Sequence, residues 1–193
     1  MRFSRPLIAT ALVSLCAAGA LFAFQDPKEM AQMMALVSPN ENHKVLEYKV
    51  GKWTGHMSLY MMPGAPPMES DLNSEVKWIM GGRFLHDTTG GTFMGQPFEG
   101  MGTSGYDNLK KKYVFSWIDN NSTSIMTGEG TWDAAKKSLT CKTSMPDPMS
   151  GKEMPARMVE TVVDADHWKM EMHVTGPDGK EALAFRIEYK RAK

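Results

Sequence analysis

The stretch WKMEMHVTGPDGKEALAFRIEY, residues 168–189, decides the fold class of this chain. Each half repeats with a period of two, and the turn signal Pro177-Asp178-Gly179 separates the halves. A period of two puts alternate side chains on opposite faces of a strand, so the stretch predicts an antiparallel hairpin with one buried face. The apolar positions are Trp168, Met170, Met172, Val174, Leu183, Phe185, Ile187 and Tyr189, and the alternating positions are Lys169, Glu171, His173, Ala184, Arg186, Glu188 and Lys190.

The same alternation extends upstream to Trp53. One face carries Tyr113, Phe115 and Trp117, and an earlier one carries Leu72, Val76, Trp78 and Met80. Turn signals separate about ten such runs, with no helical pattern between them, which predicts an all-β sandwich or an up-and-down barrel. A barrel is favoured because so long a meander would otherwise expose two edges. The signals are Pro63-Gly64, Gly81-Gly82, Gly90-Gly91, Asp107-Asn108, Asn120-Asn121, Asp133-Ala134, Pro146-Asp147, Asp164-Ala165 and Pro177-Asp178-Gly179.

Residues 1–23 are predicted to be a signal peptide. Arg2 and Arg5 precede an apolar run from Leu7 to Ala17, and Ala18-Gly19-Ala20 supplies the small residues that signal peptidase reads. The alternative is an uncleaved anchor, because the apolar run continues to Phe24 and nearly reaches the ~20 residues of a membrane span. We expect an exported protein, periplasmic or secreted, with no stable membrane insertion after cleavage.

Charge and cysteine content narrow the function classes. The chain has 22 basic and 22 acidic residues, and removing the signal peptide takes away two arginines, leaving 20 against 22, a net charge of −2. The chain therefore has no excess of basic residues that would favour binding to nucleic acid. Cleavage also removes Cys16, so Cys141 stands alone and an intramolecular disulfide is ruled out. The oligomeric state is not indicated.

Residues 24–50 are predicted to form short helices ahead of a barrel domain at 51–193. Asp26 and Glu29 have capping-box spacing around Pro27, and Ser38, Pro39 and Glu41 repeat that signature before Gly51 ends the second helix. The first helix is apolar enough to pack against another surface. Alternatively, it frays and acts as a tether between the membrane and the domain.

An ordered set of short motifs resembles the bacterial family called domain of unknown function 1579, over roughly Asn42 to Lys190. The resemblance implies a calycin-like barrel, related in architecture to lipocalins and nitrobindins, with no agreed activity or catalytic residues. The motifs are Gly51-Lys52-Trp53, Gly81-Gly82-Arg83-Phe84, Gln96-Pro97-Phe98-Glu99-Gly100, Gly105-Tyr106-Asp107-Asn108, Lys112-Tyr113 and Trp117-Ile118-Asp119.

Four kinds of residue in this sequence have both a chemical and a simpler structural interpretation: glycine, methionine, histidine and cysteine. The glycines at positions 100, 102 and 105 match the dinucleotide fingerprint, but no helix pattern follows, so we interpret them as strand glycines that allow bending or aromatic packing. The 18 methionines suggest Cu(I) capture, or an adaptable apolar lining, which is favoured. His167 and His173 lie about 20 Å apart on one outward strand face and cannot share a metal ion. No Gly-x-Ser-x-Gly elbow is present, and Cys141 fits a small buried apolar position.

The leading hypothesis is non-catalytic binding of a small, mainly apolar molecule inside the barrel, without a cofactor. A haem- or copper-binding periplasmic protein, or an enzyme whose site the sequence does not show, is the alternative. Whether the interior is a pocket or a solid core stays open. The candidate ligand-binding residues are Trp53, Met57, Trp78, Arg83, Phe115, Trp117, Met170, Met172 and Phe185.

Barrel closure gives a geometric prediction. Trp53 stands where the opening helix meets the first strand, and closure brings the first and last strands together. Arg191 has inward parity near the end of the last strand. We predict that its guanidinium, or failing that the guanidinium of Arg83, lies against the Trp53 indole.

Overall fold

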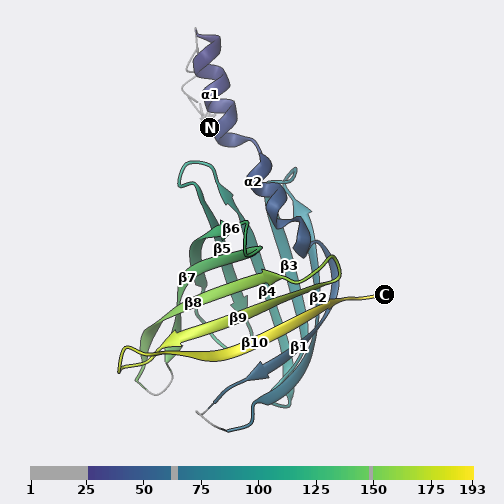
Figure 1. Ribbon diagram of the computed structural model, residues 1–193, viewed down its shortest axis with the longest axis vertical. Helices are drawn as coiled ribbons and strands as arrows, with labels where there is room; N and C mark the ends of the chain where they lie inside the picture. The colour runs from purple at the N-terminus through teal and green to yellow at the C-terminus, as the bar shows by residue number, and fades with distance from the viewer. Residues whose placement is uncertain (1–25, 62–64, 148–149) are drawn as a thin grey trace, which may run out of the picture.

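A closed barrel of antiparallel strands forms the body of the protein (Figure 1). The computed structural model describes residues 26–61, 65–147 and 150–193, so the predicted signal peptide lies outside the described residues. Each strand pairs with the next along the chain and β10 pairs with β1, which confirms the up-and-down barrel. The strands are β1 (Gly51–Leu59), β2 (Met68–Ile79), β3 (Phe84–Phe93), β4 (Gln96–Asp107), β5 (Lys112–Asp119), β6 (Met126–Asp133), β7 (Ser138–Asp147), β8 (Lys152–Val162), β9 (His167–Thr175) and β10 (Glu181–Arg191).

Alternation in the sequence becomes an inner and an outer face. Trp168 and Met172 on β9 are buried and pair with Tyr189 and Phe185 of β10. The residue of β10 after Tyr189, Lys190, points outward and is exposed. A register shift in β10 interrupts this alternation: Leu183, expected on the buried face, pairs with outward His173, whereas Phe185 pairs with inward Met172.

Barrel closure follows the predicted geometry. Trp53 of β1 pairs with Arg191 of β10, and the guanidinium carbon of Arg191 lies 4.2 Å from the centre of the Trp53 ring. Arg191 also donates to the carbonyl of Val50 and to the carboxylate of Asp166. A side chain at Gly51, whose φ is +127°, would overlap the guanidinium, so glycine is required there. The prediction that Arg191 stacks on Trp53 is confirmed.

Within residues 26–50, three short helices precede the barrel: α1 (Pro27–Val37), α2 (Glu41–Lys44) and the 3₁₀-helix η1 (Val45–Lys49). Asp26 caps α1 with Pro27 at its first turn, as expected. The predicted second start at Ser38 is wrong, because Asn40 is the N-cap of α2. The Asn40 side chain accepts from the backbone N–H of Asn42, and the Asn40 backbone N–H donates to His43 Nδ1, which satisfies both sides of the cap.

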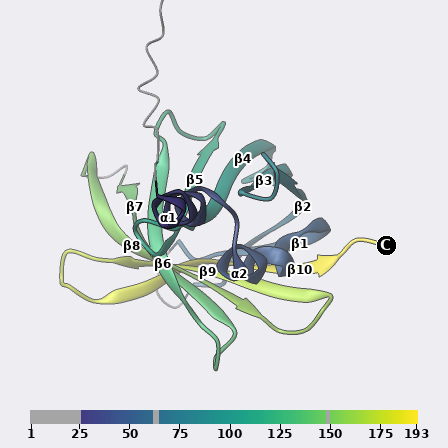
Figure 2. The same ribbon diagram turned by 90° about the horizontal axis from the view of Figure 1, so that it is seen from above.

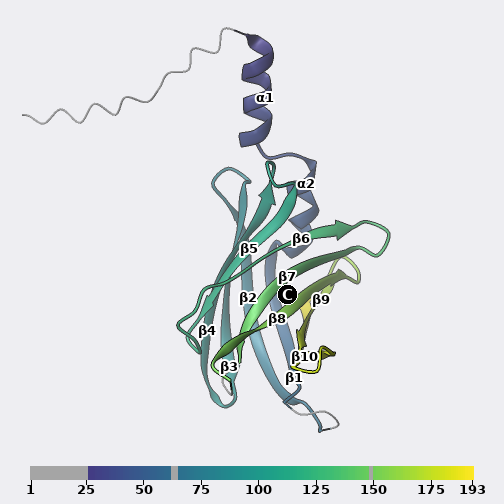
Figure 3. The same cartoon turned by 90° about the vertical axis from the view of Figure 1, so that its left-hand side faces the viewer.

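Helices α2 and η1 close one end of the barrel, which we call the plug end (Figures 1 and 3). Leu46 is fully buried there, and the Trp53 indole donates to the carbonyl of Lys49 at 2.7 Å. The Tyr48 ring lies between the rings of Trp132 and Trp168. The opposite end, where β1 leads toward β2, is called the open end.

One predicted turn is misplaced. Gly90 and Gly91 lie inside β3, and the chain turns later, at Met94 and Gly95, both with positive φ. A Cβ at Gly91 would overlap the carbonyl of Asp71 on β2, so the glycine serves close strand approach rather than a turn.

Candidate functional site in the barrel interior

Charged groups occupy the barrel interior beneath the plug. Lys49 of η1 and Glu160 of β8 form an ion pair at 2.8 Å, with 8% and 3% of each residue exposed. The Tyr48 hydroxyl donates to the other oxygen of Glu160 at 2.5 Å. Burial raises the pKa of Tyr48 well above its usual value, helped by the charge of Glu160. Burial alone would lower the pKa of Lys49, but its attraction to Glu160 outweighs this and the pKa is raised.

A second carboxylate continues this polar layer. Asp87 of β3 points inward and accepts hydrogen bonds from Ser74 at 2.7 Å and Thr89 at 3.1 Å. Burial raises the pKa of Asp87, against the opposing influence of Lys49. These hydroxyl donors satisfy a carboxylate that would otherwise be costly to bury.

The sequence pattern did not predict a charged group inside the barrel formed by Lys49, Glu160 and Asp87. Glu160 does interrupt the inward apolar positions of β8, Ala156 and Met158, which is the signal that could have found it.

The closed half of the barrel leaves no room for a ligand. The void beside the ion pair measures about 10 Å³ and is lined by Lys49, Glu160, Cys141 and Phe115 among others. That volume is roughly one water-sized sphere. Burial raises the pKa of the Cys141 thiol to about 12, so Cys141 behaves as an inert packing residue, as its strand position predicted.

Toward the open end the inner wall changes character. The side chains still point inward by register, but they are half-buried rather than buried, so solvent reaches part of each one. Such a wall is apolar, adaptable and rich in aromatic rings. Its residues are Leu59, Phe93, Phe98, Phe115, Trp117, Met126, Met145, Met154, Met170, Val174 and Phe185.

Strand glycines hold two aromatic rings flat against this wall. A Cβ at Gly100 or Gly102 of β4 would overlap the Trp117 indole, and one at Gly128 of β6 would overlap the Phe115 ring. The Trp117 indole donates to Asp119 at 2.9 Å, which fixes its orientation. The glycines therefore make space in the lumen, in agreement with their interpretation as strand glycines rather than a nucleotide-binding loop.

The predicted ligand-binding residues divide between the two halves. Phe115, Trp117, Met170 and Phe185 belong to the half-buried wall. The others on the inner face are packed more deeply. Trp53 is 1% exposed, and its indole is bound to the plug through the carbonyl of Lys49. Met57 and Met172 are buried in the middle of the barrel. Trp78 packs near the plug, and its indole donates to Glu47 at 2.6 Å.

Arg83 lies outside the lumen. Its guanidinium is exposed at the plug end and donates to the carbonyls of Val37 and Met80. Its contacts are therefore structural, at the C-terminal end of α1, and it does not share a space with the other predicted ligand-binding residues.

None of the five histidines faces the lumen wall. His43 is buried in α2 against the Tyr106 ring, and burial lowers its pKa. His56, His86, His167 and His173 have outward register. Among the described residues, no three His, Cys, Asp or Glu side chains come together in a group that could hold a metal ion.

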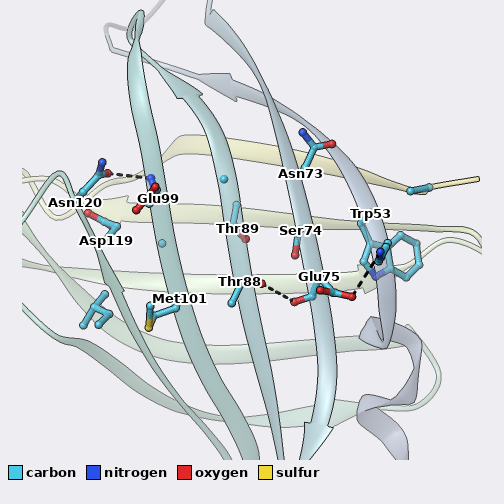
Figure 4. Close-up of a pocket in the computed structure, with 15 residues that line it drawn as sticks. Trp53, Asn73, Ser74, Glu75, Thr88, Thr89, Glu99, Met101, Asp119 and Asn120 are labelled. Carbon is cyan, nitrogen blue, oxygen red and sulfur yellow. Dashed lines mark hydrogen bonds and ion pairs between the residues drawn. The ribbon is translucent and has the colours of Figure 1, made fainter.

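An open groove of about 790 Å³, which the sequence pattern did not predict, crosses the outer face of β1–β5 (Figure 4). Exposed or half-buried side chains of outward register line it, including Asn73, Glu75, Thr88 and Met101. Glu75 lies 3.9 Å from Lys52, and this pairing is solvent-exposed. Most of the lining is exposed polar surface, and the buried lining residues Trp53, Ser74 and Thr89 have inward register, so the groove is a weaker candidate than the lumen.

Comparisons with known proteins agree with this fold. Residues 38–191 match the family described as Protein of unknown function (DUF1579), and the chain belongs to that family. A comparison with curated sequences finds no match. The crystal structure of Rv2717c from M. tuberculosis is similar at a TM-score of 0.57 and 12% identity, covering 81% of this chain and 100% of that one. A redesigned beta barrel, b11L5F_LGL, is similar at a TM-score of 0.40 and 13% identity, covering 77% and 96%.

Among the described residues, no helix has the length and apolar character needed to cross a membrane.

Proposed function

We propose that this member of the DUF1579 family is an exported protein that binds a small, mainly apolar molecule in the open half of its barrel and releases it unchanged. The observation that carries the proposal is Trp117. Its indole faces inward yet stays half-buried, held flat on Gly100 and Gly102 instead of crossing the lumen. In the closed half of the same barrel, by contrast, Trp53 is 1% and Trp168 is 3% exposed.

The chemistry of the wall supports binding over catalysis. Most half-buried inward residues of the open half are aromatic, methionine and aliphatic side chains, with Ser70, Thr143 and Asp119 as polar groups, and Asp119 accepts from the Trp117 indole. The charged groups inside the barrel lie beneath the plug: Lys49 and Glu160 pair with each other, and Asp87 accepts from Ser74 and Thr89. A haem alternative has no histidine on the lumen wall to supply an axial ligand.

A pair of neighbouring substitutions tests the proposal. Met126 of β6 points into the lumen and is paired with Trp117 on the neighbouring strand β5. The next residue, Thr127, is exposed on the outer face. A fluorescent fatty-acid probe should bind saturably with micromolar affinity, roughly −8 kcal/mol, and quench Trp117. Met126→Asp should abolish binding by placing a charge in the apolar lumen, and Thr127→Asp should leave it intact.

Circular dichroism and thermal unfolding of both variants provide the folding control. Absence of saturable binding to a panel of apolar probes, with the parent protein folded, would leave the solid-core interpretation. Equal losses in the two variants would place the probe elsewhere on the molecule.

Export is tested separately. N-terminal sequencing of the chain produced with its leader in a bacterial host should begin between Leu21 and Gln25. An intact Met1 in the membrane fraction would contradict cleavage.

A further inference from the structure

The helix α1 exposes large apolar side chains and buries none. It projects from the plug end along the long axis of the molecule (Figures 1 and 3) and is seen end-on in Figure 2. Met30, Met33, Met34 and Val37 follow the spacing i, i+3, i+4, i+7, which puts them on one face, opposite Lys28 and Gln32. The exposed fractions are 48% for Met30, 37% for Met33, 50% for Met34, 52% for Leu36 and 52% for Val37.

The base of α1 is fixed to two turns of the barrel. The Asn108 side chain, in the β4–β5 turn, donates to the carbonyls of Ala35 and Ser38 at 3.1 and 2.8 Å. Arg83, in the β2–β3 turn, donates to the carbonyl of Val37 at 3.1 Å. The helix therefore has a defined position beside these turns.

The same two turns also present apolar side chains to solvent. Leu109, next to Asn108, is 79% exposed, and Met80, close to Arg83, is 70% exposed. Met80 has a φ of 49°, a conformation in which glycine would be less strained.

Two turns at the plug end are rich in lysine. The β4–β5 turn reads Asp107-Asn108-Leu109-Lys110-Lys111-Lys112, and the β6–β7 turn reads Asp133-Ala134-Ala135-Lys136-Lys137. In each turn the aspartate accepts backbone N–H groups and the second lysine has positive φ, 55° at Lys111 and 49° at Lys137. Positions of this kind favour Gly or Asn, so a lysine carries a conformational cost. Neither lysine forms an ion pair with any residue that the structure describes.

We propose that this plug-end face, made of α1 and the β2–β3, β4–β5 and β6–β7 turns, binds the surface of an anionic lipid bilayer. The apolar face of α1 lies in the headgroup region with Leu109 and Met80 beside it, and the lysines contact anionic headgroups. Apolar burial together with nearby lysines is the combination that holds peripheral proteins on such surfaces. No segment crosses the bilayer in this arrangement.

The open end carries fewer lysines: Lys152 begins β8, and Lys180 in the β9–β10 turn pairs with Asp178 at 3.7 Å. Met94 in the β3–β4 turn and Ile125 in the β5–β6 turn are 51% and 68% exposed, but residues 94–96 and 120–125 contain no lysine or arginine. Charge therefore distinguishes the two ends and assigns the bilayer to the plug end.

Vesicle sedimentation of the exported chain tests the proposal. The chain should bind vesicles of phosphatidylcholine and phosphatidylglycerol, bind pure phosphatidylcholine weakly, and dissociate as salt rises. Met30→Ser with Met34→Ser should abolish binding without destabilising the barrel, since α1 buries nothing.

The decisive variant is Lys111→Gly with Lys137→Gly. Glycine adopts positive φ without strain, so thermal stability should be kept, while affinity for anionic vesicles should fall roughly thirtyfold for two lost lysines. Met94→Gly, at a positive-φ position of the open end, is the matched control and should bind like the parent.

Three results would overturn the proposal. Equal binding to neutral and anionic vesicles would remove the role of charge. Undiminished binding by the methionine and lysine variants would assign attachment to an uncleaved leader. A dimer in solution that Met30→Ser with Met34→Ser converts to a monomer, without vesicle binding, would show that a second copy covers α1.

Discussion

The buried ion pair between Lys49 and Glu160 gives the sharpest test of how the plug is held. Lys49→Met removes the partner of a carboxylate that is 3% exposed and leaves Tyr48 as its remaining hydrogen-bond donor. Removing one member of a buried pair strands the other charge, at a cost of about 3–5 kcal/mol. Glu160→Gln should cost a comparable amount, because it strands the Lys49 ammonium.

The double variant Lys49→Met with Glu160→Met separates charge from packing. It leaves no buried charge, and its main loss is the acceptor of the Tyr48 hydroxyl, worth about 1–3 kcal/mol. We therefore expect the double variant to be more stable than either single variant. Urea unfolding followed by tryptophan fluorescence measures all four proteins of the cycle. Costs that simply add in the double variant, or single variants within about 0.5 kcal/mol of the parent, would refute the argument.

Four further predictions concern the interior. Trp53→Ala should cost about 3–5 kcal/mol in urea unfolding, because it empties the plug; a cost under about 1 kcal/mol would contradict this role. Gly100→Ala should cost about 1–3 kcal/mol and shift the emission of Trp117, whose ring the new methyl overlaps; unchanged emission would count against the flat indole. Burial raises the pKa of Asp87 above 3.8 in the folded state, so the folded protein binds this proton more tightly than the unfolded chain does. The free energy of unfolding should therefore fall as pH rises from 3.8 through the raised pKa. Asp87→Asn should flatten that part of the stability–pH curve, and an unchanged slope would refute the role of Asp87. The Cys141 thiol, with its pKa raised to about 12 by burial, should resist thiol reagents at mildly alkaline pH until urea unfolds the barrel; rapid labelling of the folded protein would contradict its burial.

Local sequence was sufficient for the strands and for the closure of the barrel. The period of two predicted the inward direction of Trp168 and Phe185 correctly, but it failed for Leu183, because a register shift in β10 places that residue opposite outward His173. The contact of Arg191 with Trp53 followed from parity plus the requirement that the first and last strands meet.

Local sequence was insufficient where two signals compete for one position. Ser38-Pro39 and Asn40 both precede α2. Asn40 is the N-cap because its backbone N–H donates to His43 Nδ1 and because Ser38 already ends α1. Gly91 carries a turn signal, but its absent side chain accommodates β2 instead.

The sequence by itself determined the all-β class, the inner and outer faces and the pairing that closes the barrel, because these depend on the period of side chains along each strand. Only the tertiary structure decided that Lys49 meets Glu160, that Arg83 lies outside the lumen, and that Trp117 lies flat over Gly100. The pair Lys49 and Glu160 is separated by 111 positions in the chain. Contacts between elements so far apart depend on how the plug seats on the barrel, and no local period encodes that.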